Sequence, residues 1–130
     1  MSKSLGNLIL VSNELQRYSP DAFRLYLFSH HYRFPWEYMD GEIVEWQQIA
    51  DDMAMAGDLP STASGAPLDA TAQKERFLAA MENDLDTPTA IAALVELSDR
   101  IREASQSSDV TEAQQTLREL GGILGLSVAA

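Results

Sequence analysis

The first residues of the chain carry a pattern of side chains suited to binding phosphate. Ser2, Lys3 and Ser4 are followed by Leu5 and Gly6. Small hydroxyl residues and glycine let the backbone approach a phosphate group, and a flexible ammonium can follow negative charge as it develops in a reaction. Lys3 is therefore the candidate for electrostatic stabilisation of a reacting phosphate. These few residues alone are equally compatible with an N-terminal tail that has no such role.

Other groups capable of chemistry have simpler structural explanations. His30 and His31 are adjacent, so on a helix their side chains point in different directions, and no carboxylate sits at ligand spacing. We expect them to pack or cap a helix, and we predict no metal site. Asp84 and Asp86 precede a Thr-Pro pair at a predicted helix start, so capping explains them without acid–base chemistry.

The net charge of −11 is unevenly distributed along the chain. Residues 1–33 carry a formal charge of +2, residues 34–69 carry −8 and residues 70–130 carry −5. Nucleic-acid affinity comes largely from Lys and Arg neutralising phosphates, so the isolated chain should bind RNA weakly. The lack of basic neighbours also favours packing over base stacking for Phe34, Trp36 and Tyr38.

Length and composition restrict the class of protein. The 130 residues suit one ordinary domain or two small helical units, and 45% apolar residues is typical of a globular protein. No apolar run approaches the roughly 20 residues that span a bilayer, and no signal peptide is apparent, so we expect a cytoplasmic protein without membrane contact. Because the chain has no cysteine, disulfides and thiolate-bound metals are excluded.

Apolar spacing and turn residues predict mainly helices in the first half. A short strand is expected over residues 8–11, and helices over residues 13–18 and 20–31, the second of which we predict to be central. Pro20 occupies its first turn. Asp40 is expected to cap a long amphipathic helix over residues 41–56. Glycines, prolines and hydroxyl residues predict an exposed linker over residues 57–68.

Three further helices are predicted in the second half. The first is capped at residue 69 or 71 and should direct four large apolar side chains inward: Phe77, Leu78, Met81 and Leu85. Asp86 or Thr87 caps the next, over residues 88–105. Thr111 and Gln114 have the spacing of a capping box at the start of the last helix, which should stop near residues 121–122. Residues 123–126 are expected to fold back as an apolar tail.

The predicted fold is mainly α. A small strand-plus-helix unit is joined by a long helix to an antiparallel helical bundle. The predicted divisions are residues 1–38 for the first unit with its phosphate loop, 39–56 for the connecting helix, 57–68 for the linker and 69–130 for the bundle.

Five segments occur in an order found in one enzyme family. They are MSKSLGN at residues 1–7, SPDAFR at 19–24, SHHYR at 29–33, NDLDTPTA at 83–90 and LRELGGILGL at 117–126. They resemble landmarks of the cysteinyl-tRNA synthetases, a family of class I aminoacyl-tRNA synthetases, from the second signature loop through the helical DALR domain. The family's loop reads Lys-Met-Ser-Lys-Ser, so the resemblance implies a C-terminal portion that starts inside this loop.

The resemblance implies ATP-dependent activation of cysteine and transfer of cysteine to tRNA. It assigns Ser2, Lys3 and Ser4 to the ATP phosphates, with Lys3 catalytic only in the intact enzyme. The zinc site that recognises cysteine, the first signature motif and most of the nucleotide fold are expected upstream. We therefore predict that the isolated chain is inactive.

The resemblance also implies tRNA as a partner of the intact enzyme. Its first unit would contact the tRNA stem, which makes Arg24 and Arg33 candidate contacts. For Arg24, an ion pair with Asp21, three residues earlier on the predicted helix, is the simpler expectation. Surface that packs against an upstream domain should lie near residues 1–33, so we expect that end to be disordered or to self-associate.

Two alternatives remain open from the sequence. The cysteine ligase of mycothiol synthesis looks like a shortened cysteinyl-tRNA synthetase, and this chain stops where a bacterial cysteinyl-tRNA synthetase usually continues. The other alternative is a free-standing helical module that binds a protein partner and has no enzymatic activity.

Overall fold

The structure is a computed structural model that describes residues 18–36, 41–60, 66–105 and 108–128. These residues contain five helices and no strand: α2 (Pro20–Phe28), α3 (Glu42–Asp58), α4 (Thr71–Glu82), α5 (Thr87–Ala104) and α6 (Thr111–Ile123). The prediction of a mainly α fold is confirmed. The predicted strand over residues 8–11 and residues 13–17 of the following predicted helix lie outside the described residues.

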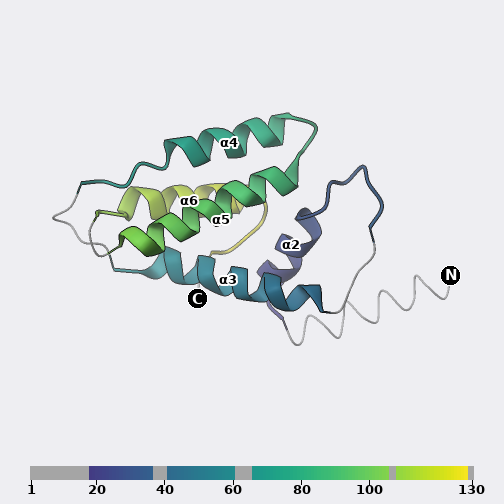
Figure 1. The fold of residues 1–130 in the computed structure, drawn as a ribbon, viewed down its shortest axis with the longest axis horizontal. Coiled ribbons are helices and arrows are strands. Elements are labelled where there is room, and N and C mark those ends of the chain that lie inside the picture. Colours follow the sequence, from purple (N-terminus) through teal and green to yellow (C-terminus); the bar gives the residue numbers. More distant parts are fainter. Residues whose placement is uncertain (1–17, 37–40, 61–65, 106–107, 129–130) are drawn as a thin grey trace.

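The central helix is α5, which packs against each of the other four described helices. In Figure 1, α4, α5 and α6 run alongside one another, α3 passes beneath them, and the short α2 sits against α3. Ile91, Leu94, Ser98 and Ile101 of α5 are buried as their spacing predicts, whereas Val95 is half-buried. The prediction that the helix at residues 20–31 is central is therefore wrong.

Helix α2 begins as predicted and ends three residues early. The side chain of Ser19 accepts a hydrogen bond from the backbone N–H of Ala22 at 3.2 Å, which caps the start. At the other end, the hydroxyl of Ser29 donates to the carbonyl of Tyr26 at 2.5 Å. A serine that bonds a nearby carbonyl offers the backbone an alternative to the helix, so the chain leaves α2 there and residues 29–36 form a loop.

Helix α3 continues two residues into the predicted linker because α6 satisfies its last carbonyl groups. The side-chain amide of Gln114 donates to the carbonyls of Ala56 at 2.9 Å and Leu59 at 2.7 Å. The guanidinium of Arg118 donates to the carbonyl of residue 57. The end of an α-helix leaves carbonyl groups without partners inside the helix, and here distant side chains supply them. The linker therefore starts at residue 59; residues 61–65 lie outside the described residues.

Helices α4 and α6 start with the same device. Asp69 accepts from the N–H of Thr71 at 2.9 Å, and Asp109 accepts from the N–H of Thr111 at 3.1 Å. A parallel bridge between residues 67 and 109 joins the two starts. The predicted capping box of Thr111 and Gln114 is wrong, because Gln114 bonds α3 instead.

The predicted inward face of α4 is only partly correct. Phe77 is fully buried and Met81 half-buried, but Leu78 is 40% exposed and Leu85 51% exposed. Leu85 lies beyond the end of α4, in the turn before α5, so the helical spacing no longer applies to it. The chain after α6 folds back as predicted and buries three apolar residues: Leu124, Leu126 and Val128.

Candidate functional site

The predicted phosphate loop, with Ser2, Lys3 and Ser4, lies outside the described residues. The candidate site within them is formed where the loop after α2 meets the turn between α4 and α5. We call this place the loop–turn junction, comprising residues 29–36 and 83–87. Two of the five sequence landmarks, SHHYR and NDLDTPTA, meet there.

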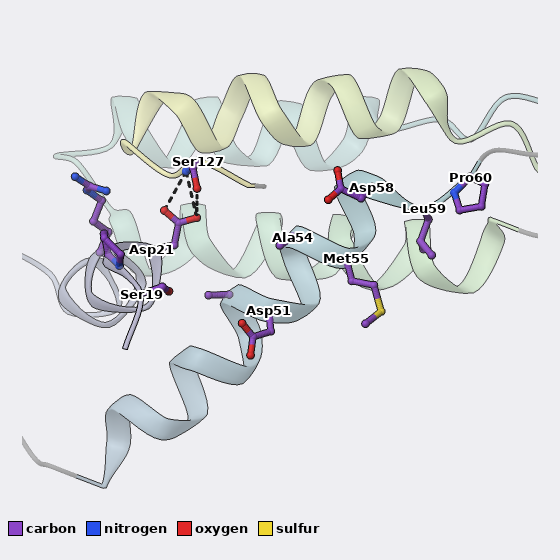
Figure 2. A pocket seen from close by; sticks show the side chains of 12 residues that line it. Ser19, Asp21, Asp51, Ala54, Met55, Asp58, Leu59, Pro60 and Ser127 are labelled. Atoms are coloured by element: carbon purple, nitrogen blue, oxygen red, sulfur yellow. Dashed lines mark hydrogen bonds between the residues drawn. The ribbon is translucent and has the colours of Figure 1, made fainter. Parts of the chain in front are cut away.

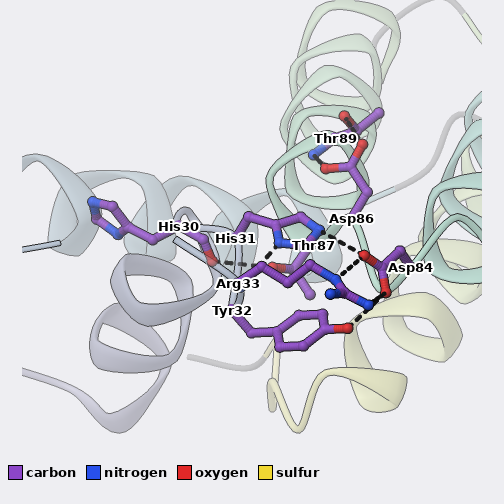
Figure 3. Close-up of polar contacts among 8 residues, drawn as sticks. All are labelled: His30, His31, Tyr32, Arg33, Asp84, Asp86, Thr87 and Thr89. Carbon is purple, nitrogen blue, oxygen red and sulfur yellow. Dashed lines mark hydrogen bonds and ion pairs between the residues drawn. The ribbon is translucent and has the colours of Figure 1, made fainter. Parts of the chain in front are cut away.

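One carboxylate holds the loop–turn junction together (Figure 3). Asp84 Oδ1 accepts hydrogen bonds from Tyr32 Oη at 2.6 Å and from Arg33 Nη2 at 3.1 Å. Asp84 Oδ2 accepts from Arg33 Nε, which completes a two-pronged pairing, and His31 Nε2 lies 4.0 Å from the same oxygen. A planar guanidinium bonded through two nitrogens fixes the orientation as well as the distance of the pair. Three consecutive loop residues are therefore aligned on one side chain of the turn.

The turn presents Asp84 through an uncommon backbone conformation. Asp84 and Leu85 have φ of +55° and +53°, in the left-handed region that non-glycine residues seldom adopt. Directly afterwards, Asp86 accepts from the N–H of Thr89 at 3.4 Å and from its hydroxyl at 2.7 Å, which caps α5 as predicted. The two left-handed residues reverse the chain between two helix ends, and the pairing with Arg33 stabilises that reversal.

Hydrogen bonding sets the protonation states at the loop–turn junction. The hydrogen bond from Arg33, followed by that from Tyr32, lowers the pKa of Asp84. The same contact with Asp84 raises the pKa of Arg33, and the bond to Asp84 raises the pKa of the Tyr32 phenol. At neutral pH, Asp84 is therefore ionised while Tyr32 and Arg33 keep their protons. This arrangement is suited to positioning the loop and unsuited to proton transfer.

Arg33 was a candidate tRNA contact from the sequence, whereas Asp84 was assigned no functional role, and the pairing between them was not predicted. Asp84 was expected to cap a helix, and only Asp86 does so. Fifty-one residues separate Arg33 from Asp84. The sequence signal that could have indicated the pairing is that each residue belongs to a family landmark. Tyr32, which lies in the same landmark as Arg33, was missed as well.

Arg24 does not pair with Asp21, although the structure describes both residues. Asp21 instead accepts from the N–H of Ser127 at 3.0 Å, from its hydroxyl at 2.9 Å and from the N–H of Val128 at 3.2 Å. Figure 2 shows Asp21 and Ser127 side by side, joined by these hydrogen bonds, at the edge of a hollow beside α2 and α3. Arg24 is exposed, and its Nε lies 3.4 Å from where a Cβ on Gly125 would be. The predicted Arg24–Asp21 ion pair is therefore wrong, and Arg24 stays accessible.

The two histidines pack as expected. The ring of His30 stacks on Trp36 with centroids 3.8 Å apart and an interplanar angle of 5°, and its Nδ1 lies 3.1 Å from the carbonyl of Tyr26. The ring of His31 stacks on Tyr32. Within the described ranges, no three His, Cys, Asp or Glu side chains gather in a way that could hold a metal ion. No described helix combines the length and apolar character needed to span a membrane.

Comparison with known proteins connects both halves of the loop–turn junction to one family. The model of the class I tRNA synthetase (C) catalytic domain matches residues 1–48, and the DALR domain model matches residues 76–129. The cysteine–tRNA ligase of Dichelobacter nodosus is 36% identical over 126 residues, which cover 97% of this chain and 27% of that protein. The chain belongs to the cysteine–tRNA ligase family. The ion pair between Arg33 and Asp84 thus joins the region that matches the catalytic domain to the region that matches the DALR domain.

Further cysteine–tRNA ligases match to the same extent. That of Dehalococcoides mccartyi is 36% identical over 98% of this chain and 29% of its own length, and that of Pseudomonas aeruginosa is 36% identical over 97% and 27%. The chain therefore spans just over a quarter of the relatives it matches. These matches favour the cysteine–tRNA ligase family over the mycothiol-pathway ligase and over a free-standing interaction module.

Proposed function

We propose that this chain supplies the ATP-phosphate loop and the tRNA-contacting helical domain of a cytoplasmic cysteine–tRNA ligase. In the intact enzyme it supports ATP-dependent activation of cysteine and transfer of cysteine to tRNA. The observation that carries this proposal is the 36% identity to the ligase of Dichelobacter nodosus across 97% of the chain. The division into residues 1–38, 39–56, 57–68 and 69–130 belongs to the proposal, with the helical boundary moved to residue 58.

The proposed ATP contacts lie in the region that matches the catalytic domain. Ser2, Lys3 and Ser4 hold the ATP phosphates, and Lys3 stabilises the charge that develops as the α-phosphate is attacked. Bound ATP would supply the adenylyl group that activates the cysteine carboxylate, with pyrophosphate as the leaving group. Zinc is assigned to a part of the relatives that this chain does not match, in keeping with a chain that contains no cysteine.

The proposed tRNA contacts are Arg24 and Arg33. Both side chains are accessible: Arg24 is exposed, and Arg33 remains 60% exposed while paired with Asp84. Because the chain carries a net charge of −11, its affinity for tRNA in isolation is weak and depends on the rest of the enzyme for phosphate neutralisation. Self-association through the surface near residues 1–33 is part of the same proposal.

A chimera tests the proposal. The matched segment of the Pseudomonas aeruginosa ligase is replaced by this chain, and cysteine-dependent ATP–pyrophosphate exchange and tRNA cysteinylation are measured. We expect both activities, and we expect Lys3→Ala to lower the exchange rate about 100- to 1,000-fold, as loss of a single electrostatic group in an active site does. Lys74→Ala, on the exposed side of α4, is the matched control. A folded chimera in which Lys3→Ala and Lys74→Ala perform alike would contradict the role of Lys3.

The isolated chain gives a second test. We expect no cysteine-dependent ATP–pyrophosphate exchange from the purified 130 residues, and detectable exchange would defeat this expectation. Sedimentation of the same sample examines self-association. A monomer in which residues 1–7 are well ordered and contact nothing would oppose that part of the proposal.

A further inference from the structure

An apolar hollow of about 460 Å³ opens beside the loop–turn junction. Its walls come from the end of α2, the loop after it, the turn before α5 and the end of α6. We call it the aromatic hollow, and its principal wall residues are Leu27, Tyr32, Trp36, Leu85 and Ile123. None of these residues is buried.

Exposed apolar side chains concentrate at the aromatic hollow. Nine large apolar side chains are exposed in the described part of the chain, and five of them line this one hollow. Their exposed fractions run from 36% for Trp36 to 61% for Tyr32. Phe34, 67% exposed, lies two residues from each of these. Single exposed apolar residues need no explanation, whereas a cluster around a concave surface indicates a binding site.

The rings at the hollow are held in stacked pairs. Trp36 stacks on His30 at 3.8 Å, and Tyr32 stacks on His31 at 4.9 Å with an interplanar angle of 22°. The guanidinium of Arg33 lies 5.4 Å from the centre of the Tyr32 ring. Since Asp84 fixes both Tyr32 and Arg33, the ring and the cation are positioned before any ligand arrives. Aromatic rings beside a cation form a platform on which nucleic-acid bases stack.

The charges around the aromatic hollow make it a better place for a polyanionic ligand than the other hollows of the described chain. No Asp, Glu, Lys or Arg side chain lines the aromatic hollow, and the paired Arg33 and Asp84 adjoin it through Tyr32. By contrast, three acids and one arginine line each of two other hollows: Asp21, Asp51 and Asp58 with Arg24 beside α2 and α3, and Glu96, Asp99 and Glu103 with Arg100 between α3 and α5. In a chain of net charge −11, a nucleic acid meets less repulsion at the aromatic hollow than at either of these.

We propose that the aromatic hollow receives an unpaired base of RNA, stacked on Tyr32 and Trp36 with its phosphate beside Arg33. This inference rests on the proposed function, which makes tRNA the natural source of such a base. The apolar walls of Leu85 and Ile123 cover the edge of the base. Stacking is tolerant of base identity because every base has a flat face, so the site selects unpaired bases rather than a sequence.

The first experiment uses the full chain with Trp46→Phe. The chain has two tryptophans, so this substitution leaves Trp36 as the single tryptophan fluorophore. Its fluorescence is titrated with an adenosine octanucleotide and, separately, with an abasic octamer of the same sugar and phosphate. We expect saturable quenching by the first and little by the second. The slope of log affinity against log salt should be near −0.7, as one neutralised phosphate on a single strand gives. Equal quenching by both octamers, or none by either, would overturn the proposal.

Two variants distinguish the contribution of the Tyr32 ring from that of its hydrogen bond to Asp84. Tyr32→Phe keeps the ring and loses the bond to Asp84, so binding should persist. Tyr32→Ala should weaken binding about 5- to 150-fold, which corresponds to the loss of one stacked base. Val44→Ala is the matched control, since Val44 is an apolar side chain on α3 that is 54% exposed against 61% for Tyr32, and it should bind like its parent. A Tyr32→Ala variant that matches its parent, or quenching that follows self-association in sedimentation, would overturn the proposal.

The chimera distinguishes this inference from the proposed function. Tyr32→Ala should raise the KM for tRNA by a larger factor than it changes ATP–pyrophosphate exchange. An active chimera whose KM for tRNA is unchanged by Tyr32→Ala would overturn the inference and leave the proposed function standing. An inactive chimera, alongside an isolated chain that binds the octanucleotide through Tyr32, would contradict the proposed function and support the base-binding hollow.

Discussion

Two carboxylates attach the α2 region to the bundle, and they do so in opposite ways. Asp21 projects from α2 and accepts hydrogen bonds from backbone N–H groups of Ser127 and Val128. Asp84 projects from the bundle and accepts from the side chains of Tyr32 and Arg33 in the loop after α2. The first attachment uses neutral donors, two backbone N–H groups and the Ser127 hydroxyl, and the second uses an exposed ion pair together with the Tyr32 phenol.

The two attachments differ in how many particular side chains they require. Two of the donors to Asp21 are backbone N–H groups, which are present whatever the side chains are, so this attachment depends chiefly on Asp21 itself. The Asp84 attachment needs at least two, Arg33 and Asp84, and an exposed ion pair adds little stability because water and salt screen it. We infer that the Asp21 attachment mainly stabilises the fold, whereas the Asp84 attachment mainly orients Tyr32 and Arg33.

A third attachment, from Gln114 of α6 to the end of α3, is buried and uncharged. Its removal should cause the largest loss of stability. Gln114→Ala removes the donors to the carbonyls of Ala56 and Leu59, at a residue only 6% exposed. We expect a loss of about 2–3 kcal/mol in the free energy of unfolding, because buried carbonyls are left without partners. Urea unfolding measures it. Gln115→Ala, which removes an exposed bond to Glu119, should cost less than about 0.5 kcal/mol. Equal losses in the two variants would contradict the ranking.

The Asp21 attachment should come next in size. Asp21→Asn removes the charge that accepts from Ser127 and Val128, and we expect a loss of about 1–2 kcal/mol because bonds to charged acceptors are stronger than neutral ones. Urea unfolding of the variant measures it. Asp58→Asn, in the same hollow but at the C-terminal end of α3, is the control and should be neutral or slightly stabilising. A larger loss of stability in Asp58→Asn than in Asp21→Asn would contradict this ranking.

The ion pair should have a smaller effect that disappears in salt. A double-mutant cycle with Arg33→Met and Asp84→Asn isolates the coupling, and asparagine tolerates the left-handed φ of residue 84. We expect favourable coupling at low ionic strength and much less at 1 M NaCl, where the screening length falls to about 3 Å. The effect of Asp21→Asn should change less over the same range. A coupling that salt leaves unaltered would remove the distinction between the two attachments.

The smallest effect should appear in the pH dependence of the Asp84 attachment. The pKa of Asp84 is lowered from its ordinary value of 3.8, chiefly by the bond from Arg33. A lowered pKa means that the contribution to stability is present above pH 3.8 and is lost as the pH falls through the folded-state value. The difference in stability between the parent and Asp84→Asn should therefore be the same at pH 7 and pH 5 and shrink below about pH 4. A difference that grows on acidification would contradict this sign.

The sequence predicted features whose cause is local. The Asp86 cap, the buried face of α5 and the buried tail follow from neighbouring residues, and they are confirmed. The end of α3 was placed too early because its carbonyls are satisfied by Gln114 and Arg118, more than fifty residues away. Leu85 was assigned to the core because nothing in the sequence shows its left-handed φ.

The site was predictable in its parts and not in its assembly. Arg33 was a candidate from its landmark, and Asp84 was expected to cap a helix, but the pairing between them is a property of the folded chain. Phe34, Trp36 and Tyr38 were predicted to pack because basic residues are few nearby, and Tyr38 lies outside the described residues. The structure shows that Tyr32 and Trp36 stack on their own histidines and leave ring surface exposed, which residue counting cannot reveal.

The bond from Ser127 to Asp21 makes the chain nearly circular. It joins positions 106 residues apart, close to the two ends of the described region. Residues 21 and 127 therefore lie side by side although almost the whole described region separates them in sequence. A circular permutant of residues 18–128 that joins these two positions through a short linker should keep the helical packing.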